Sequence, residues 1–334
     1  MIRIGKISYW HVHAWDYTNQ ALQHEDTEIV AVWDEIVERG EASANKLGVP
    51  FVANLNEMLA RPDIDAVIVD APTNIHTEVI LAAAKAGKHI FTEKVIAPTW
   101  REVNEILQQV TESNIKLTVS LPRLNFGYTL AIQDIINQGL LGQVTQVRSR
   151  LSHNGATANW LPEHFYNMEQ CGGGALIDLG CHPMYLTRMF LGELPTAVSA
   201  HFGYMTGREV EDNATAILTT KSGAIGIVEA GFVNDFSPFV IEVQGTKGTI
   251  LYNDADNKLL FRSSQGSGMW SKEWNELPIP ADRHTAFDQW VDHIKQNTIA
   301  DHNIEMAADL TKLMEAANIA ARESRSVQLT ELNS

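Results

Sequence analysis

Short apolar runs alternate with amphipathic stretches over residues 1–120, and this alternation constrains the fold more than any other feature. Residues 28–34 read EIVAVWD and residues 64–70 read IDAVIVD, so both runs are apolar along most of their length. Such runs are typical of strands that are buried on both faces of a parallel sheet. Because strands that alternate with helices build βαβ units, the pattern predicts a doubly wound α/β sheet.

Six strands and five helices are expected in this first half, and the pattern then changes. The strands are residues 2–8, 28–34, 51–52, 64–70, 89–92 and 116–120, and the helices are residues 13–23, 38–46, 55–60, 76–86 and 99–112. After Pro122 one helix, 128–138, is followed mainly by β segments, at residues 143–153, 196–202, 213–220, 224–233, 239–244, 249–252 and 258–262. Two helices, 284–296 and 304–324, come last.

This pattern predicts two domains. Residues 1–122 are expected to form a Rossmann-type dinucleotide-binding domain with a doubly wound parallel sheet. Residues 123–334 are expected to form an α+β domain with a large, mostly antiparallel open sheet.

Charge, hydropathy and cysteine content exclude several classes of partner. The formal net charge of −16 disfavours binding to nucleic acid or to an anionic membrane surface. No apolar run approaches the ~18 residues of a membrane-spanning helix, and the first residues read as a strand rather than as a signal peptide. Cys171 and Cys181 lack the C-x-x-C spacing of a zinc site, so we expect a reducing, cytoplasmic compartment.

The acid at the end of the second expected strand indicates a nucleotide. Asp34 stands where a dinucleotide-binding βαβ unit places the residue that binds the adenosine ribose hydroxyls. Glu35 follows it, so the 2′-phosphate of NADP would meet two negative charges. The pair predicts NAD in preference to NADP, while the structural alternative is an ordinary acid at a strand end.

The glycine motif that normally follows the first strand, G-x-G-x-x-G, is missing. Ser8, Trp10 and His13 stand where the three glycines are expected. Glycine at those positions provides a tight turn and a close approach to the pyrophosphate. We expect Ser8, Tyr9, Trp10 and His11 to contact the cofactor instead, through polar side chains and through backbone N–H groups at the start of the next helix.

A glycine-rich stretch in the second half carries an acid and a histidine. Residues 172–182 read GGGALIDLGCH, and a helix starting near Gly174 would place Asp178 and His182 on one face, one turn apart. The glycines would let backbone N–H groups approach a ligand. A carboxylate beside an imidazole orients the ring and raises its basicity, which suits a general base. The alternative is a glycine-rich loop followed by an acid–histidine pair that only satisfies itself.

Together these motifs resemble the glucose–fructose oxidoreductase and inositol dehydrogenase family (Gfo/Idh/MocA) over essentially the whole chain. The segments that carry the resemblance are Asp34 after VAVW, APTNIH at 71–76, AGKHIFTEK at 86–94, GLLGQV at 139–144 and the stretch 172–182. The family's Glu-Lys-Pro motif corresponds to Glu93, Lys94 and Val95, with valine in place of proline.

The resemblance implies a role for several residues. Lys94 would lie near the nicotinamide C4 and the reacting oxygen, and Asp178 and His182 would form the acid–histidine pair beneath the substrate. The residues that would line the cofactor are Ala71, Pro72, Thr73, Asn74, His76, Glu93 and Lys94. Tyr185 stands where many members have a second aspartate. The C-terminal sheet would form a subunit interface, so we expect a homodimer or homotetramer.

The activity implied is NAD-dependent hydride transfer to or from a hydroxyl or keto carbon of a sugar, inositol or related polyol. His182 would take the hydroxyl proton, Asp178 would orient the ring, and Lys94 would donate to the developing alkoxide. Substrate contacts are also expected from Lys94, Arg123, His153, Trp160 and His182. Arg123 is open to two other interpretations, a cofactor contact or a salt bridge at the domain junction. His153, Trp160, His164 and Tyr166 are equally open to plain packing under a long loop.

Two other functions fit parts of the sequence. His11-Val12-His13 after the first strand resembles the H-x-H metal ligands of a barrel hydrolase. His153, Asp178 and His182 could complete such a metal site. The chain has about six βα steps rather than eight and no convincing companion ligands, so we expect no metal. The degraded nucleotide turn also fits a cofactor-sensing or binding module without turnover.

Overall fold

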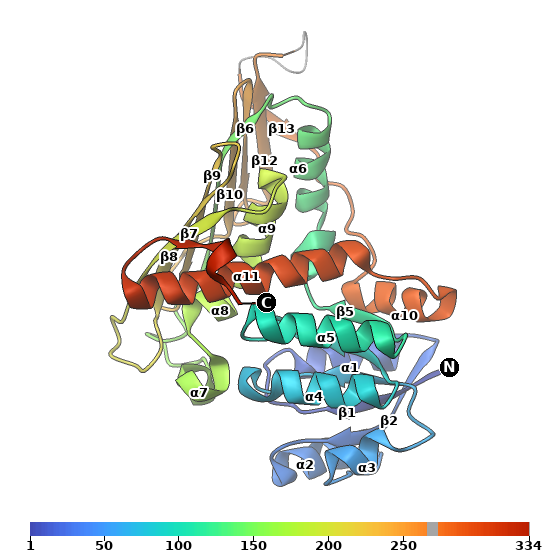
Figure 1. Cartoon of the computed structure of the whole chain (residues 1–334). Helices are drawn as coiled ribbons and strands as arrows, with labels where there is room; N and C mark the ends of the chain where they lie inside the picture. Colours follow the sequence, from blue (N-terminus) through green and yellow to red (C-terminus); the bar gives the residue numbers. More distant parts are fainter. Residues whose placement is uncertain (266–272, 334) are drawn as a thin grey trace. The chain divides into compact units, whose positions relative to one another are not determined.

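The computed structural model describes residues 1–265 and 273–333, which divide into two compact units. Unit 1 comprises residues 1–121 and 284–308, and unit 2 comprises residues 122–283 and 309–333 (Figure 1). The boundary that we expected after residue 122 lies after residue 121. Residues 284–308, which we expected in the second domain, belong to the first unit.

Unit 1 contains a parallel sheet of five strands in the order β2-β1-β3-β4-β5. The strands are β1 (Ile2–Ile7), β2 (Thr27–Trp33), β3 (Ala66–Val69), β4 (His89–Thr92) and β5 (Leu117–Val119). The strand order reverses between β1 and β3, and doubly wound sheets bind ligands beyond the carboxyl ends of the strands at such a switch point.

The strand expected at residues 51–52 is reduced to one bridge, between Phe51 and Val32. The segment is too short to continue, because the Asn54 side chain caps α3 by accepting the Glu57 N–H only three residues after Phe51. Phe51 thus marks the edge position beyond β2 without forming a sixth strand.

Six helices surround this sheet within unit 1. They are α1 (Ala14–Gln23), α2 (Val37–Leu47), α3 (Leu55–Leu59), α4 (Thr73–Lys85), α5 (Trp100–Glu112) and α10 (Ala286–Gln296). Phe287 and Trp290 of α10 are buried against Phe91 of β4, with ring centroids 5.5 and 5.8 Å apart. This apolar face explains why the segment 284–308 packs with unit 1 although it follows the whole of the second sheet in sequence.

Unit 2 contains a nine-stranded sheet in the order β13-β12-β11-β10-β6-β9-β8-β7-β14. The strands are β6 (Val144–Ser152), β7 (Ala197–Gly203), β8 (Asn213–Thr219), β9 (Ile225–Gly231), β10 (Val240–Gly245), β11 (Gly248–Asn253), β12 (Lys258–Ser263), β13 (Asn275–Leu277) and β14 (Val327–Gln328). All neighbouring pairs are antiparallel except β6 and β9, which run parallel. The seven expected strands are present, whereas the short edge strands β13 and β14 were not expected.

The helices of unit 2 are α6 (Gly127–Asn137), α7 (Met168–Cys171), α8 (Ala175–Asp178) and α9 (Cys181–Leu191). Short 3-10 helices occur at Pro122–Asn125, Glu163–Tyr166 and Leu329–Glu331. The last long helix, α11 (Asp301–Glu323), contributes residues 301–308 to unit 1 and residues 309–323 to unit 2. Across the described ranges, no helix combines the length and apolar character needed to cross a membrane.

The predicted fold class is confirmed: a doubly wound parallel sheet is followed by a mostly antiparallel open sheet. Neither sheet is the closed eight-stranded barrel that the metal-hydrolase alternative requires.

Candidate active site

A serine builds the turn after β1 in place of the first missing glycine. Ser8 has a φ of 65°, the left-handed conformation that glycine usually supplies. Its hydroxyl oxygen accepts the Trp10 N–H at 3.1 Å, and the Asp34 carboxylate accepts the Tyr9 N–H at 2.8 Å. These two N–H groups, which belong to the turn where we expected cofactor contacts, are therefore already bonded within the turn.

Asp34 at the end of β2 is buried and fully engaged. Its carboxylate also accepts the Ile36 N–H at 2.8 Å and pairs with the Arg39 guanidinium at 2.7 Å. Arg39 reaches Glu35 as well, at 2.5 Å. We did not expect Arg39 here, although its i, i+4 spacing from Glu35 predicts an ion pair on one helix face. Because Arg39 offsets both negative charges, the expected preference for NAD over NADP depends on the position of Asp34 and less on net charge.

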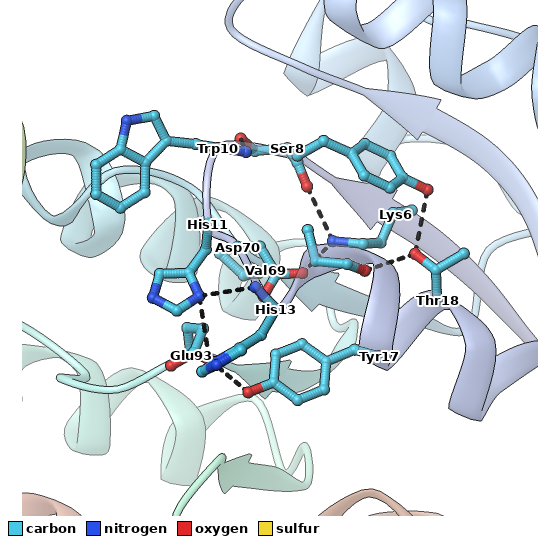
Figure 2. Close-up of polar contacts among 12 residues, drawn as sticks. Lys6, Ser8, Trp10, His11, His13, Tyr17, Thr18, Val69, Asp70 and Glu93 are labelled. Carbon is cyan, nitrogen blue, oxygen red and sulfur yellow. Dashed lines mark hydrogen bonds and ion pairs between the residues drawn. The ribbon is translucent and has the colours of Figure 1, made fainter. Parts of the chain in front are cut away.

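Glu93 lies at the carboxyl end of β4, buried among donors (Figure 2). Its Oε1 accepts the Tyr17 hydroxyl and lies 2.9 Å from His13 Nδ1 and 3.4 Å from His11 Nδ1. Its Oε2 accepts the Lys94 N–H at 2.7 Å. Burial opposes ionisation, but His11, His13 and Lys94 outweigh it and hold the pKa of Glu93 well below its usual range. Glu93 therefore remains a carboxylate that fixes the backbone at Lys94.

The turn after Lys94 is supported by a buried histidine from α4. The peptide bond between Lys94 and Val95 is cis, and His76 Nδ1 lies 3.0 Å from the Val95 carbonyl oxygen. Burial lowers the pKa of His76, so its ring is neutral and Nδ1 donates to that carbonyl. His76, which the resemblance places along the cofactor, thus supports the turn that carries Lys94.

The other residues of the 71–76 segment lie at the start of α4. Ala71 and Pro72 are buried, whereas Thr73 is half-buried and Asn74 is exposed. Pro72, the N-cap residue of α4, makes no side-chain cap hydrogen bond, and the N-terminus of α4 follows directly after β3 at the switch point. An uncapped helix start at this place suits an anionic ligand.

In unit 2, a glutamate occupies the N–H groups of the glycine-rich stretch. Glu211 is buried, and its carboxylate accepts the Gly174 N–H at 2.8 Å and the Leu176 N–H at 2.9 Å. Its carbonyl oxygen accepts the Ala175 N–H at 2.8 Å. A Cβ on Gly174 would lie 2.0 Å from that carbonyl oxygen. The expectation that these N–H groups approach a ligand is wrong, because Glu211 takes them.

The single helix expected through Asp178 and His182 is interrupted. α8 ends at Asp178 and α9 begins at Cys181, with Leu179 and Gly180 between them. A Cβ at Gly180 would lie 2.6 Å from the Leu176 carbonyl oxygen, so glycine permits the close turn. His182, the second residue of α9, is buried beside the turn.

His182 is oriented by Tyr185. The His182 Nδ1 lies 3.2 Å from the Tyr185 hydroxyl oxygen, which also accepts the Arg123 N–H at 3.0 Å. Burial raises the pKa of Tyr185 well above its usual range, so its hydroxyl stays protonated. Asp178 also acts on His153: burial lowers the pKa of His153, and the Asp178 charge partly offsets that effect.

Arg123 and the loop residues are held by aromatic contacts within unit 2. The Arg123 guanidinium lies 4.2 Å from the Phe239 ring centroid and donates to the Tyr128 hydroxyl at 2.9 Å. His153 stacks on Phe232 with centroids 5.0 Å apart.

The same loop contains one cavity of about 510 Å³. His153 lines it together with Asn154, Asn234 and Asp235. Trp160 is exposed, contacts the His153 ring and donates to Asn154. His164 is half-buried, and Tyr166 packs beneath the Arg208 guanidinium. The structure thus brings His153 and Trp160 together, with His153 on the wall of the cavity.

Comparison with known proteins decides the family. Residues 1–121 match the oxidoreductase family with an NAD-binding Rossmann fold, and residues 129–251 match the GFO/IDH/MocA C-terminal domain. The chain belongs to the Gfo/Idh/MocA oxidoreductase family. The inositol 2-dehydrogenase of Rhizobium meliloti (strain 1021) is 30% identical over 257 residues, which cover 74% of this chain and 72% of that protein.

Other similar proteins act on sugars or share the fold. The 1,5-anhydro-D-fructose reductase of Ensifer adhaerens is 29% identical over 238 residues, covering 69% of this chain and 70% of that protein. A levoglucosan dehydrogenase solved in complex with NADH and levoglucosan has a TM-score of 0.80 at 20% identity, covering 98% of this chain and 99% of that one. An NAD-binding protein from Listeria innocua has a TM-score of 0.83 at 24% identity, covering 98% and 96%.

This member of the Gfo/Idh/MocA family contains polar residues that sequence reasoning missed. Glu211 stands 37 positions after Gly174, and no local motif marks it. Tyr17 stands 76 positions before Glu93, inside an ordinary amphipathic helix. Both contacts arise between segments that are distant in sequence, so only the tertiary structure identifies them.

Proposed function

We propose that the chain is an NAD(H)-dependent dehydrogenase or reductase acting on a hydroxyl or keto carbon of a sugar, inositol or related polyol. The observation that carries this proposal is the Glu93–Lys94 turn at the carboxyl end of β4, one strand from the switch point of an NAD-binding fold. Membership of the oxidoreductase family supports the reaction class, and the named relatives support the substrate class.

The residues of unit 1 fit a dinucleotide. Asp34 at the end of β2 would hold the adenosine ribose, and the uncapped start of α4 at Thr73 and Asn74 would face the phosphates. NAD, when bound, supplies the hydride acceptor or donor. The chain itself supplies the charge: the Lys94 ammonium donates to the substrate oxygen and stabilises negative charge as it develops there.

Unit 2 supplies the proton acceptor. For His182 to act as a base through Nε2, Nδ1 must carry a proton and donate it to the Tyr185 oxygen, a contact of 3.2 Å. Tyr185 would therefore share the orienting role that we assigned to Asp178. Asp178 also raises the pKa of His153 against the effect of burial, so we keep it among the candidate residues of the site.

His182→Ala and Lys94→Ala test this mechanism with a panel of sugars and polyols, monitored by NADH absorbance. Loss of a general base typically costs about 10²–10⁴ in kcat, and NADH affinity should change little in His182→Ala. Lys94→Ala should cost at least as much, and the double variant should be less than additive if both groups act on one oxygen. Tyr185→Phe should shift the pH profile of kcat without abolishing turnover. A kcat within about threefold of normal in His182→Ala, with hydride transfer rate-limiting, would remove His182 from the mechanism.

One observation favours a second function. Because Tyr9 and Trp10 use their N–H groups inside the turn, the phosphate cradle is weaker than in a glycine-rich turn. A binding module that senses NADH without turnover fits this arrangement. Tight NADH binding with no turnover across the whole panel would favour it over the dehydrogenase.

The same proposal extends to assembly and compartment. We propose a homodimer or homotetramer formed through the face of the nine-stranded sheet that lies opposite α9. Cys171 and Cys181 are both buried free thiols, which fits a reducing, cytoplasmic compartment.

A further inference from the structure

Three potential metal ligands converge at the switch point of unit 1. His11 and His13 follow β1, and Glu93 follows β4, on either side of β3. One ligand atom from each lies within 4.8 Å of the others (Figure 2). The sequence offered the two histidines without a third ligand, and the fold supplies that ligand from 80 residues further along the chain.

The atoms face one another in a way that suits a shared cation. His11 Nδ1 accepts the His13 N–H at 3.3 Å and lies 3.4 Å from Glu93 Oε1. Two ligands bound tetrahedrally at about 2.1 Å are themselves about 3.4 Å apart. A divalent cation between Nδ1 and Oε1 would take the place of a proton shared by these two atoms.

The surrounding shell resembles the support that metal ligands usually have. Tyr17 donates to Glu93 Oε1, and the Lys94 N–H donates to Oε2, so the carboxylate is held from both sides. Asp70, the residue after β3, adds an independent observation. Its carboxylate is completely buried and pairs with Lys6 through Oδ2, while no donor among the described residues reaches Oδ1. Lys6 balances the charge of this carboxylate, so the unmet need at Oδ1 is for a hydrogen-bond donor.

We propose that His11, His13 and Glu93 bind one divalent transition-metal ion, of which Zn²⁺ is the test ion. Two imidazoles and one carboxylate match the ligand preference of Zn²⁺ and its neighbours, and three protein ligands leave a position open. The His13 side chain is 40% exposed, which gives the ion a path from solvent. The site replaces our expectation of no metal, which depended on the lack of a companion ligand.

The site is tested with the untagged full chain after treatment with a chelator, by calorimetric titration with Zn²⁺ and by the visible spectrum of Co²⁺. One equivalent should bind, and thermal unfolding should move to higher temperature with Zn²⁺. Glu93→Gln and His11→Asn should each weaken Zn²⁺ at least about tenfold, with asparagine keeping an acceptor for the His13 N–H. His13→Ala should do the same, and its half-exposed site makes it the variant least dependent on folding. His302→Asn removes an exposed imidazole of α11 and should bind Zn²⁺ normally.

Neither readout uses enzymatic activity, so the result is independent of the dehydrogenase proposal. Stoichiometric Zn²⁺ binding that is lost in folded His13→Ala and kept in His302→Asn supports the site. No stoichiometric uptake by the unmodified chain, or uptake that is unchanged in His13→Ala, overturns it.

Discussion

One buried carboxylate, Glu211, occupies the donors that the glycine-rich stretch would otherwise offer to a ligand. It accepts N–H groups from Gly174 and Leu176, yet burial raises its pKa to about 6, against a usual value of 4.5. The native chain therefore holds this proton more tightly than the unfolded chain does. The contribution to stability is fully present below pH about 4.5 and is lost as the pH rises through about 6.

Glu211→Gln should therefore destabilise more at pH 5 than at pH 7.5. The variant leaves one N–H without its acceptor, which costs about 1–3 kcal/mol, and it cannot titrate. The difference in unfolding free energy between variant and unmodified chain should grow by about 1 kcal/mol at the lower pH, measured by urea denaturation. Glu209→Gln, at an exposed position nearby, should cost the same at both pH values. A cost for Glu211→Gln that does not change with pH would contradict the assigned proton.

At the scale of elements, the position of α8 depends on the atoms that pack against Gly174, the residue just before the helix. A Cβ on Gly174 would lie 2.0 Å from the Glu211 carbonyl oxygen and 2.9 Å from Val210 Cγ2. Backbone atoms cannot swing aside, so Gly174→Ala should shift α8 and destabilise the chain by about 1–3 kcal/mol. Gly203→Ala on β7 is the control, since its nearest neighbour is 3.5 Å from an added Cβ. Equal melting temperatures for the two variants would show that the α8 backbone adapts freely.

Elements with a strong local pattern could be predicted from the sequence, and those defined by tertiary contacts could not. The apolar runs predicted β1 to β5 and the seven longer strands of the second sheet, because burial on one or both faces leaves a pattern in the sequence. The edge strands β13 and β14 are too short to show one. The break between α8 and α9 depends on Gly180 packing against Leu176, which a helical period does not reveal.

The candidate site residues divide in the same way, into those that a local motif predicts and those that only tertiary contacts identify. Lys94, Asp178 and His182 came from motifs with fixed spacing, and their roles remain proposals that the kinetic variants test. Tyr17, which contacts Glu93, and Glu211, which contacts Gly174, are distant in sequence from the residues that they contact, and no motif marks them. The third ligand of the proposed metal site was missed for this reason, although both histidines were recognised at once.

At the scale of the whole molecule, the nine-stranded sheet carries exposed apolar side chains on the face opposite α9. Gly226 and Leu218 face Thr187 and Leu191 of α9, so the alternate residues of β8 and β9 point to the other face. Ile217 and Ile225 on that face are 38% and 39% exposed. Exposed apolar residues grouped on a sheet face mark a site of association.

We expect the 37.1 kDa chain to run as a dimer or tetramer in light scattering, and Ile217→Glu to shift it towards monomer. Ile217 lies directly opposite Ile227 in the register of β8 and β9, so a carboxylate there would be buried without a partner in the assembly. Ile299→Glu is the matched control, because Ile299 is 60% exposed in the loop before α11. A monomeric unmodified chain would rule out the assembly. If the oligomer persists in Ile217→Glu, the interface lies on another surface. Burying an unpaired charge in the interface would cost more free energy than a contact through this sheet face provides.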